Sequence, residues 1–144
     1  MGHSDTHREL HRMFNERQFA AMREHFAPEF TYEDLPRQVV IKSTDEFLDY
    51  LAQGWAASFS DAEVASAEYL EGPDSSVAVF HGRGTNDGSL ADFAPTGRTM
   101  DVVFTEAMTF GSDGKVQVGR LNYDQLTLLV QLGHMPAPGD QPAS

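Results

Sequence analysis

Apolar residues recur at helical spacing near the start of the chain. Leu10, Met13 and Phe14 lie three and four positions apart, so they share one face of a helix. Ser4 or Asp5 can supply its N-cap, because a short polar side chain accepts a hydrogen bond from an amide of the first turn. The pattern predicts an amphipathic helix at the beginning of the fold.

Two more helical segments are expected in the first half of the chain. Residues 18–25 form a short segment that ends before Pro28. Residues 43–46, Ser-Thr-Asp-Glu, have the capping-box pattern and open a helix that runs to about Ser58. The apolar face of this helix carries Phe47, Leu51 and Trp55.

Alternating apolar and polar residues dominate the rest of the sequence, as is typical of strands with one buried face. The expected strands are residues 30–35, 62–72, 75–87, 98–110 and 115–124. A short helix follows and ends at Gly133, a residue suited to the left-handed C-cap position. The predicted class is therefore α+β, with N-terminal helices on a curved antiparallel sheet and room for an apolar pocket between the two layers.

Length and composition are those of one globular domain. The chain has 144 residues, of which 40% are hydrophobic and 10% aromatic, enough for one sizeable core. We expect a single domain over residues 1–135. Residues 136–144 are rich in Pro and Ala and are expected to form a flexible tail.

Charge and cysteine content argue against several classes of function. The formal net charge is −12, whereas a surface for nucleic acid or anionic lipid needs clustered Lys and Arg. The chain has no cysteine, which excludes disulfides, thiolate nucleophiles and cysteine-bound zinc. The polar N-terminus and the short apolar runs predict neither a signal peptide nor a membrane span. We expect a cytoplasmic protein with no nucleic-acid or membrane partner.

Two carboxylates stand out on the last two predicted strands. Glu106 interrupts a strand face that is otherwise apolar. A hairpin loop with Gly114 in the left-handed conformation would set Glu106 opposite Arg120 and on the same face as Asp124. A carboxylate on an apolar face loses water, which raises its pKa and makes it a usable base near neutral pH. Glu106 and Asp124 are therefore candidates for acid/base chemistry.

Each of these carboxylates also has a structural interpretation. Glu106 could form an ion pair with Arg120 or Arg98. Asp124 could be the N-cap of the last helix, with its carboxylate accepting hydrogen bonds from backbone amides of the first turn. Spacing alone does not separate a cap from a catalyst.

Other chemistries fit the sequence poorly. The only lysines, Lys42 and Lys115, lie at turns or strand edges, whereas a Schiff base needs a buried lysine. His3, His7 and His11 recur at helical spacing and could bind a metal on one helix face. We interpret them instead as part of a solvated first helix, and we expect neither a metal nor an organic cofactor.

Several longer motifs together resemble one enzyme family. They include GTNDGSLADFAPTGRTMDV at residues 84–102 and GKVQVGRLNYDQLTLLVQLG at residues 114–133. The PTGR turn and the QLG ending are the more specific parts of these stretches. The chain resembles the SnoaL-like polyketide cyclases of the nuclear-transport-factor-two-like superfamily. The likeness covers most of the chain and implies a cone-shaped α+β fold.

The resemblance also implies an activity and a site. Cyclases of this family close a polyketide ring by intramolecular aldol condensation without a cofactor, with an Asp at the end of the last strand as general acid/base. Asp124 occupies that position. Family histidines are replaced here by Asn86, in the Thr85–Gly88 motif, and by Met108 on the penultimate strand. The second polar partner of Asp124 is therefore expected to be Glu106 or Asn86.

Three functions compete on these grounds. The first is a cofactor-independent cyclase of secondary metabolism, such as antibiotic biosynthesis, with a polyketide-like substrate and Asp124 and Glu106 as catalytic residues. Its expected substrate-binding residues are Asn86, Asn122 and Arg120 for the enolate oxygen, and Phe14, Tyr32, Trp55, Phe104 and Met108 for the apolar walls. The others are a cofactor-free hydroxylase or pericyclic ring-closing enzyme on the same fold, and a non-catalytic binding or dimerisation module. By analogy with the family, we expect a homodimer that pairs through the outer face of the sheet.

Overall fold

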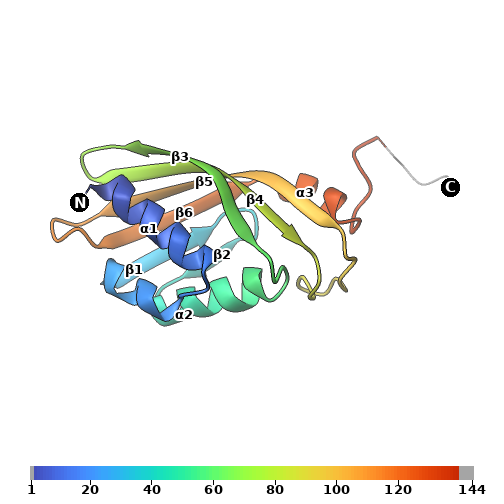
Figure 1. Ribbon diagram of the computed structural model, residues 1–144, viewed down its shortest axis with the longest axis horizontal. Coiled ribbons are helices and arrows are strands. Elements are labelled where there is room, and N and C mark those ends of the chain that lie inside the picture. Colours follow the sequence, from blue (N-terminus) through green and yellow to red (C-terminus); the bar gives the residue numbers. More distant parts are fainter. Residues whose placement is uncertain (1, 140–144) are drawn as a thin grey trace.

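A six-stranded sheet is the framework of the fold (Figure 1). The protein is represented by a computed structural model that describes residues 2–139. The strands are β1 (Phe26–Asp34), β2 (Val39–Ile41), β3 (Glu63–Glu71), β4 (Ser75–Thr85), β5 (Thr99–Phe110) and β6 (Val116–Tyr123). Their order across the sheet is β2-β1-β6-β5-β4-β3.

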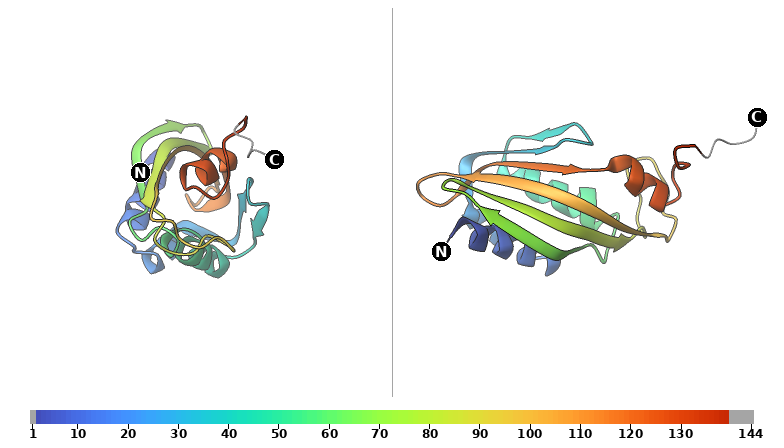
Figure 2. Two further views of the ribbon diagram at one scale, coloured as in Figure 1. Left: turned by 90° about the vertical axis from the view of Figure 1, so that its right-hand side faces the viewer. Right: turned by 90° about the horizontal axis from the view of Figure 1, so that it is seen from above.

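Helices cover the concave side of this sheet and one of its ends. They are α1 (His3–Asn15), the 3-10 helix η1 (Ala20–His25), α2 (Thr44–Asp49), the π-helical segment η2 (Tyr50–Ala56) and α3 (Gln125–Gln131). Helix α1 packs on β3 and β4, α2 packs on β1, and α3 packs on β5. The end-on view in Figure 2 shows the strands curling around the interior. This arrangement confirms the predicted cone-shaped α+β class. No helix in the described part of the chain is long and apolar enough to cross a membrane.

The sheet is mixed rather than purely antiparallel. β1 runs parallel to β6, while every other neighbouring pair is antiparallel. The reason lies in the chain path, because β1 and β2 form a hairpin before α2, and the meander β3–β6 then returns its last strand alongside β1. The prediction of an antiparallel sheet is therefore wrong at this one pair. The short strand β2 was not predicted.

The helix starts follow capping chemistry. The side chain of Ser43 accepts a hydrogen bond from an amide of the first turn of α2 at 3.1 Å, which confirms the predicted capping box start. Helix α1 begins at His3, so its N-cap is Gly2 and not Ser4 or Asp5. Asp5 instead accepts from the Gly2 amide at 3.0 Å.

The helix that begins with α2 widens in its second half. The amide of Ala57 donates to the carbonyl of Ala52 at 2.8 Å, a five-residue spacing that is characteristic of a π-helical turn. Side chains five apart then share a face. As a result, Trp55 Nε1 donates to the Tyr50 hydroxyl at 2.8 Å. This turn brings an aromatic pair to the interior next to the sheet.

The C-terminal helix ends as its sequence predicts. Gly133 has a φ of 83°, and its amide donates to the carbonyl of Val130 at 3.0 Å. The next amide, of His134, donates to the Leu129 carbonyl at 2.9 Å, which completes a left-handed C-cap. Residues 140–144 of the predicted tail lie outside the described residues, so its flexibility stays a prediction.

The core fills the space between the helices and the concave face of the sheet. Along β5 every second side chain is buried, and the intervening ones are exposed or half-buried. The buried members are Met100, Val102, Phe104, Glu106, Met108 and Phe110. Glu106 is the only charged group in this set and is 6% exposed, so its surroundings decide what it can do.

Candidate active site

An apolar cavity lies between α1, the α2–η2 helix and the concave face of the sheet. Its volume is about 80 Å³. Most of its lining is aliphatic or aromatic; the polar side chains on it are His11, Tyr32, Tyr50, Glu63 and Glu106. A space of this size holds a few water-sized groups, so it can admit a small part of a ligand but not a whole polyketide.

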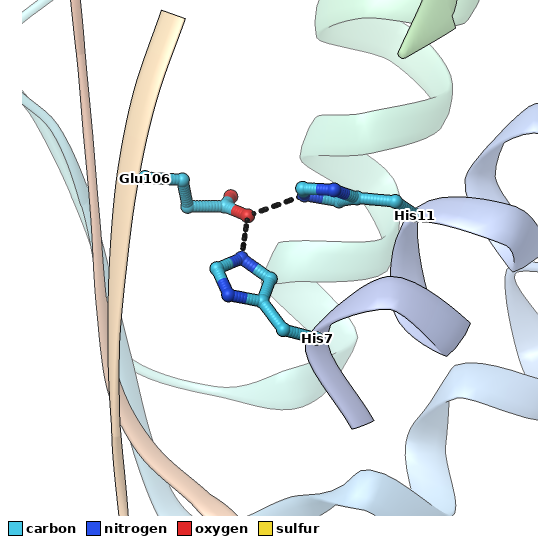
Figure 3. Close-up of side chains that lie close together, drawn as sticks. All are labelled: His7, His11 and Glu106. Carbon is cyan, nitrogen blue, oxygen red and sulfur yellow. Dashed lines mark hydrogen bonds and ion pairs between the residues drawn. The ribbon is translucent and has the colours of Figure 1, made fainter. Parts of the chain in front are cut away.

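The carboxylate of Glu106 accepts three side-chain hydrogen bonds at the wall of this cavity. Its Oε1 accepts from His7 Nε2 at 2.9 Å and from His11 Nε2 at 2.7 Å (Figure 3). Its Oε2 accepts from the Tyr32 hydroxyl at 2.5 Å. A buried carboxylate needs such partners to replace the water that it has lost.

The two histidines come from one face of α1, four residues apart. Their other ring nitrogens are also paired, His7 Nδ1 with Ser76 Oγ at 2.9 Å and His11 Nδ1 with the Tyr69 hydroxyl at 2.8 Å. A hydroxyl can donate or accept, so both partners suit either tautomer of the ring. Among residues 2–139, no lysine or arginine forms an ion pair with Glu106.

Burial and hydrogen bonding set the charge states of this network. Burial raises the pKa of Glu106, but the hydrogen bonds from His11 and His7 outweigh it and hold that pKa well below its usual range. Burial lowers the pKa of His7. Burial and the nearby Glu106 charge raise the pKa of Tyr32 far above its usual range. At neutral pH, Glu106 is therefore ionised, His7 is uncharged and Tyr32 is a hydrogen-bond donor.

A second buried carboxylate, Asp34, lies at the end of β1. Its side chain is fully buried and accepts hydrogen bonds from the Tyr50 hydroxyl at 2.6 Å and the Tyr123 hydroxyl at 3.1 Å. The backbone amide of Arg37 donates to Oδ1 of this carboxylate at 3.1 Å, and the guanidinium Nε of Arg37 lies 3.8 Å from its Oδ2. Burial, with the adjacent Asp34 charge, raises the pKa of Tyr50 well above its usual range. The cluster thus holds both phenols as donors.

A larger groove of about 710 Å³ lies outside the inner cavity. Its lining includes Arg37, Tyr123 and residues of β2, η2 and α3. The Arg37 guanidinium stacks on the Trp55 ring, 3.9 Å from the ring centre. Because Trp55 lines the inner cavity and Arg37 lines the groove, this stacked pair links the walls of the two spaces.

Comparison with known proteins assigns the chain to a family. The family described as SnoaL-like polyketide cyclase matches residues 4–132, which is most of the sequence. The chain belongs to the SnoaL-like polyketide cyclase family. No curated protein matches it in sequence.

Solved structures share the SnoaL-like fold at low sequence identity. AclR, a candidate hydroxylase from Streptomyces galilaeus, has a TM-score of 0.80 and 20% identity, over 97% of this chain and 84% of that chain. IdmH, a candidate polyketide cyclase from Streptomyces antibioticus, has a TM-score of 0.79 and 22% identity, over 92% of this chain and 99% of that chain. A candidate SnoaL-like polyketide cyclase from Jannaschia sp. CCS1 has a TM-score of 0.76 and 21% identity, over 92% of this chain and 94% of that chain. Such identities show a shared fold and leave the reaction open.

Asp124, which the family resemblance predicted as the general acid/base, is the N-cap of α3. Its carboxylate accepts from the Thr127 amide at 3.0 Å and from the Thr127 hydroxyl at 2.8 Å. These bonds lower its pKa. Asp124 is exposed and lines neither the inner cavity nor the outer groove. The capping interpretation thus describes its contacts, and its expected place on the cavity face is wrong.

A β-bulge explains why the predicted register fails. The hairpin turn forms as expected, with Gly114 at a φ of 77°, and Phe110 pairs with Val116. Thr109 then pairs with Val118, so Gln117 is an extra residue in β6. Beyond this bulge, Glu106 pairs with Leu121 instead of Arg120. The exposed residues of β6 include Arg120 and Asn122, so neither reaches the cavity.

The expected enolate-binding residues therefore do not gather at the cavity. Besides the two exposed residues of β6, Asn86 is fully buried but lines neither space. Its amide nitrogen donates to the Gly88 carbonyl at 2.8 Å, and its oxygen lies 2.9 Å from His134 Nε2. These contacts hold the loop before β5 to the end of α3. The contacts of Asn86 are therefore those of a residue that holds a loop in place, and none of them faces the cavity.

The expected apolar walls do meet at the inner cavity. Its lining includes Phe14, Tyr32, Trp55, Phe104 and Met108. Their contact with a substrate stays a prediction. Sequence periodicity found them because burial on helices and strands follows spacing.

His7 and His11 are the site residues that the sequence interpretation missed. They are 0% and 8% exposed, so their placement on a solvated helix face is wrong. A signal was present, because His7 lies three residues before Leu10 and His11 lies three residues before Phe14, within the apolar stripe of α1. Asp34 had no comparable signal, since its two phenol partners come from distant segments.

Proposed function

We propose that the protein catalyses a cofactor-independent ring closure in a polyketide-like carbonyl compound by acid/base catalysis, with Glu106 as the proton acceptor. The observation that carries this proposal is an ionised carboxylate, buried at an apolar cavity, with a phenol donor on one of its oxygens. Membership of the SnoaL-like polyketide cyclase family supports the same reaction class.

The contacts of Glu106 supply both halves of an enolisation. As a substrate carbonyl enters the cavity, the Tyr32 hydroxyl moves its hydrogen bond from Glu106 Oε2 to the carbonyl oxygen. The freed Oε2 takes the α-proton, and the electron pair of the C–H bond forms an enolate whose oxygen accepts from Tyr32. The enolate carbon then attacks a second carbonyl of the same molecule, and the resulting alkoxide takes the proton back from Glu106.

The low pKa of Glu106 restricts the substrates that this base can serve. A carboxylate kept ionised by two histidines is always available as an acceptor near neutral pH, but it is a weak base. It therefore suits an acidic α-proton, such as one between two carbonyls of a polyketide chain. Tyr32, held protonated by its own high pKa, compensates by stabilising the oxyanion.

The two spaces suggest how a long substrate is divided. The inner cavity of about 80 Å³ accommodates only the reacting segment, whereas the groove of about 710 Å³ accommodates the remainder. The Arg37–Trp55 stacked pair belongs to the walls of both spaces, so a substrate that reaches from the groove into the cavity contacts this pair. Binding is expected to quench or shift the fluorescence of Trp55, the only tryptophan.

Exchange of α-protons into D2O tests the proposal without knowledge of the natural substrate. Proton NMR would follow exchange in a panel of small ketones and β-ketoesters, in the presence of EDTA. We expect Glu106→Gln to reduce enzyme-dependent exchange by about 10²–10⁴-fold, the usual contribution of one positioned acid/base group. Asp124→Asn is the matched control, because Asn also caps helices, and it should keep exchange within about twofold. Equal loss in both variants, or loss in Asp124→Asn alone, would contradict the assignment of Glu106.

A hydroxylase is the second candidate, favoured by the similarity to AclR. The same proton removal gives a carbanion, and molecular oxygen is then the co-reactant that adds to its carbon. The peroxide takes up a proton and loses water, which breaks the O–O bond and leaves a carbonyl. Oxygen uptake during turnover distinguishes this reaction from ring closure, which consumes no oxygen. A non-catalytic module would bind ligands in the groove but show no Glu106-dependent exchange.

A further inference from the structure

We infer that His7, His11 and Glu106 also form a binding site for a divalent transition metal ion of the Zn²⁺ type, and that occupancy blocks proton transfer at Glu106. The inference concerns the same carboxylate as the proposed function and rests on that function only for its effect on catalysis. Metal binding itself is measured without substrate, so the two proposals can fail separately.

The three side chains provide a compact ligand set. Their candidate ligand atoms lie within 4.8 Å of one another, two on successive turns of α1 and one on β5 (Figure 3). Nε2 of His7 and of His11 are 2.9 and 2.7 Å from Glu106 Oε1. Ligand atoms around a tetrahedral zinc ion are about 3.3 Å apart. These two nitrogen–oxygen separations therefore need to widen by only about half an ångström, and the two Nε2 atoms lie within 4.8 Å of one another.

The partners of the outer ring nitrogens favour metal ligation. Metal-bound histidines donate their other N–H to an oxygen that fixes the ring. Ser76 Oγ and the Tyr69 hydroxyl already lie 2.9 and 2.8 Å from these Nδ1 atoms. When a metal displaces the proton from Nε2, the ring carries it on Nδ1 and the hydroxyl becomes the acceptor. The Ser76 hydrogen can then turn to Ser4 Oγ, 3.2 Å away.

The negative charge of Glu106 also favours a bound metal ion. Glu106 carries a buried negative charge with no lysine or arginine partner among the described residues. A divalent cation supplies the missing positive charge, and both histidines bind it in their neutral form. Tyr32 holds Oε2 at 2.5 Å, which leaves Oε1 as the single ligand atom from the carboxylate.

The cavity supplies the open coordination position. His11 and Glu106 both line it, so the fourth ligand of the ion is a water or a substrate oxygen within the cavity. Two histidines, one carboxylate and an open position are a ligand set that zinc accepts. Because the ion binds Oε1 and draws negative charge from the whole carboxylate, Oε2 becomes too weak a base for the proton removal that enolisation needs.

Titration of the chelator-treated full chain with Zn²⁺ and Co²⁺ tests the site. Calorimetry gives the stoichiometry, and the visible ligand-field bands of Co²⁺ report a four- or five-coordinate site in the unaltered protein. We expect one ion per chain with a dissociation constant below about 10 μM, weaker than a structural zinc site with four protein ligands. His7→Gln and Glu106→Gln should weaken binding by at least about tenfold. His81→Asn is the matched control, since His81 pairs with Asp101 on the exposed face of the sheet.

The outcomes separate cleanly. Tight 1:1 binding that is lost in both site variants and kept in His81→Asn supports the site, as does loss of α-proton exchange on addition of Zn²⁺. Ser76→Ala should also weaken binding by about tenfold, because it removes the acceptor for His7 Nδ1–H. No binding below about 1 mM, or equal binding in Glu106→Gln and the unaltered protein, overturns the inference. If the His7 variant does not fold, the Co²⁺ spectrum of the unaltered protein and the Glu106→Gln comparison still decide the question.

Discussion

Glu106 illustrates how neighbours rather than burial alone set the chemistry of a single residue. An apolar strand face by itself predicts a raised pKa. The two histidines of α1 reverse that effect, because each donates an N–H to the carboxylate. The residue consequently stays ionised, and in the proposed reaction it would be a base of limited strength, while His7 stays neutral beside it.

The lowered pKa values in this network predict acid sensitivity. His7 has a lower pKa in the folded chain than its ordinary value of 6.5, so the unfolded state binds more protons below that pH. The free energy of unfolding therefore falls as the pH drops from 7 through 5. Glu106 adds a further loss below its ordinary value of 4.5, since its folded pKa is also lowered.

Urea unfolding at pH 7.5, 6 and 5 checks this prediction. His7→Gln should show a shallower fall in stability over that range than the unaltered protein, because it lacks the titrating group. Surface charges are common to both proteins, so the difference between the two curves isolates His7. Parallel curves would show that His7 does not titrate differently in the folded and unfolded chains.

At the scale of elements, the bulge in β6 decides which side chains meet the cavity. One extra residue at Gln117 moves Leu121 and Tyr123 inward and turns Arg120 outward. A strand has a two-residue period, so a single insertion exchanges its two faces. The π-helical turn of η2 acts similarly, since it aligns Trp55 with Tyr50 through a five-residue spacing.

Insertion of one alanine between Gly119 and Arg120 should therefore be far more damaging than deletion of Gln117. The insertion shifts the rest of β6 by one residue and turns Arg120 and Asn122 towards the core, which buries a charge without a partner. We expect loss of a cooperative thermal transition. Deletion of Gln117 removes only the bulge, because Val118 then follows Val116 opposite Thr109 and Glu106 still pairs with Leu121, so this variant should keep a cooperative transition. An insertion variant that melts like the unaltered protein would mean that β6 takes up the extra residue in a second bulge.

At the scale of the whole molecule, the outer face of the sheet presents apolar residues. Leu70, Val77 and Ala107 are aligned across β3, β4 and β5, and Leu70 is 61% exposed. Val103, also on β5, is 51% exposed. Such a surface fits the homodimer expected by family analogy, which stays a proposal.

Light scattering after gel filtration tests this proposal. The unaltered chain should elute with twice its mass of 15.9 kDa. Val103→Lys should weaken association by at least about tenfold, because a lysine would be desolvated in the interface. Val40→Lys is the control, since Val40 is about as exposed as Val103 but lies on β2, an edge strand on the other side of the sheet. A monomer mass for the unaltered protein would contradict the dimer.

Local patterns in the sequence determined most of the elements of this protein. The capping box at residues 43–46, the Gly133 cap and the alternation along β5 are short-range features, and the structure contains all three. Family motifs likewise predicted the cone-shaped fold. The apolar residues of the cavity wall followed from periodicity, since burial depends on which face of an element a residue occupies.

Tertiary structure alone decided how these elements meet. The parallel pairing of β1 with β6 and the extra residue at Gln117 are set by packing between distant segments and leave no local mark. The same is true of the network of His7, His11 and Glu106, in which Glu106 lies 99 and 95 residues after the two histidines. Side-chain charge depends on contacts within a few ångströms, so only the folded chain could assign Asp124 its cap and Glu106 its partners.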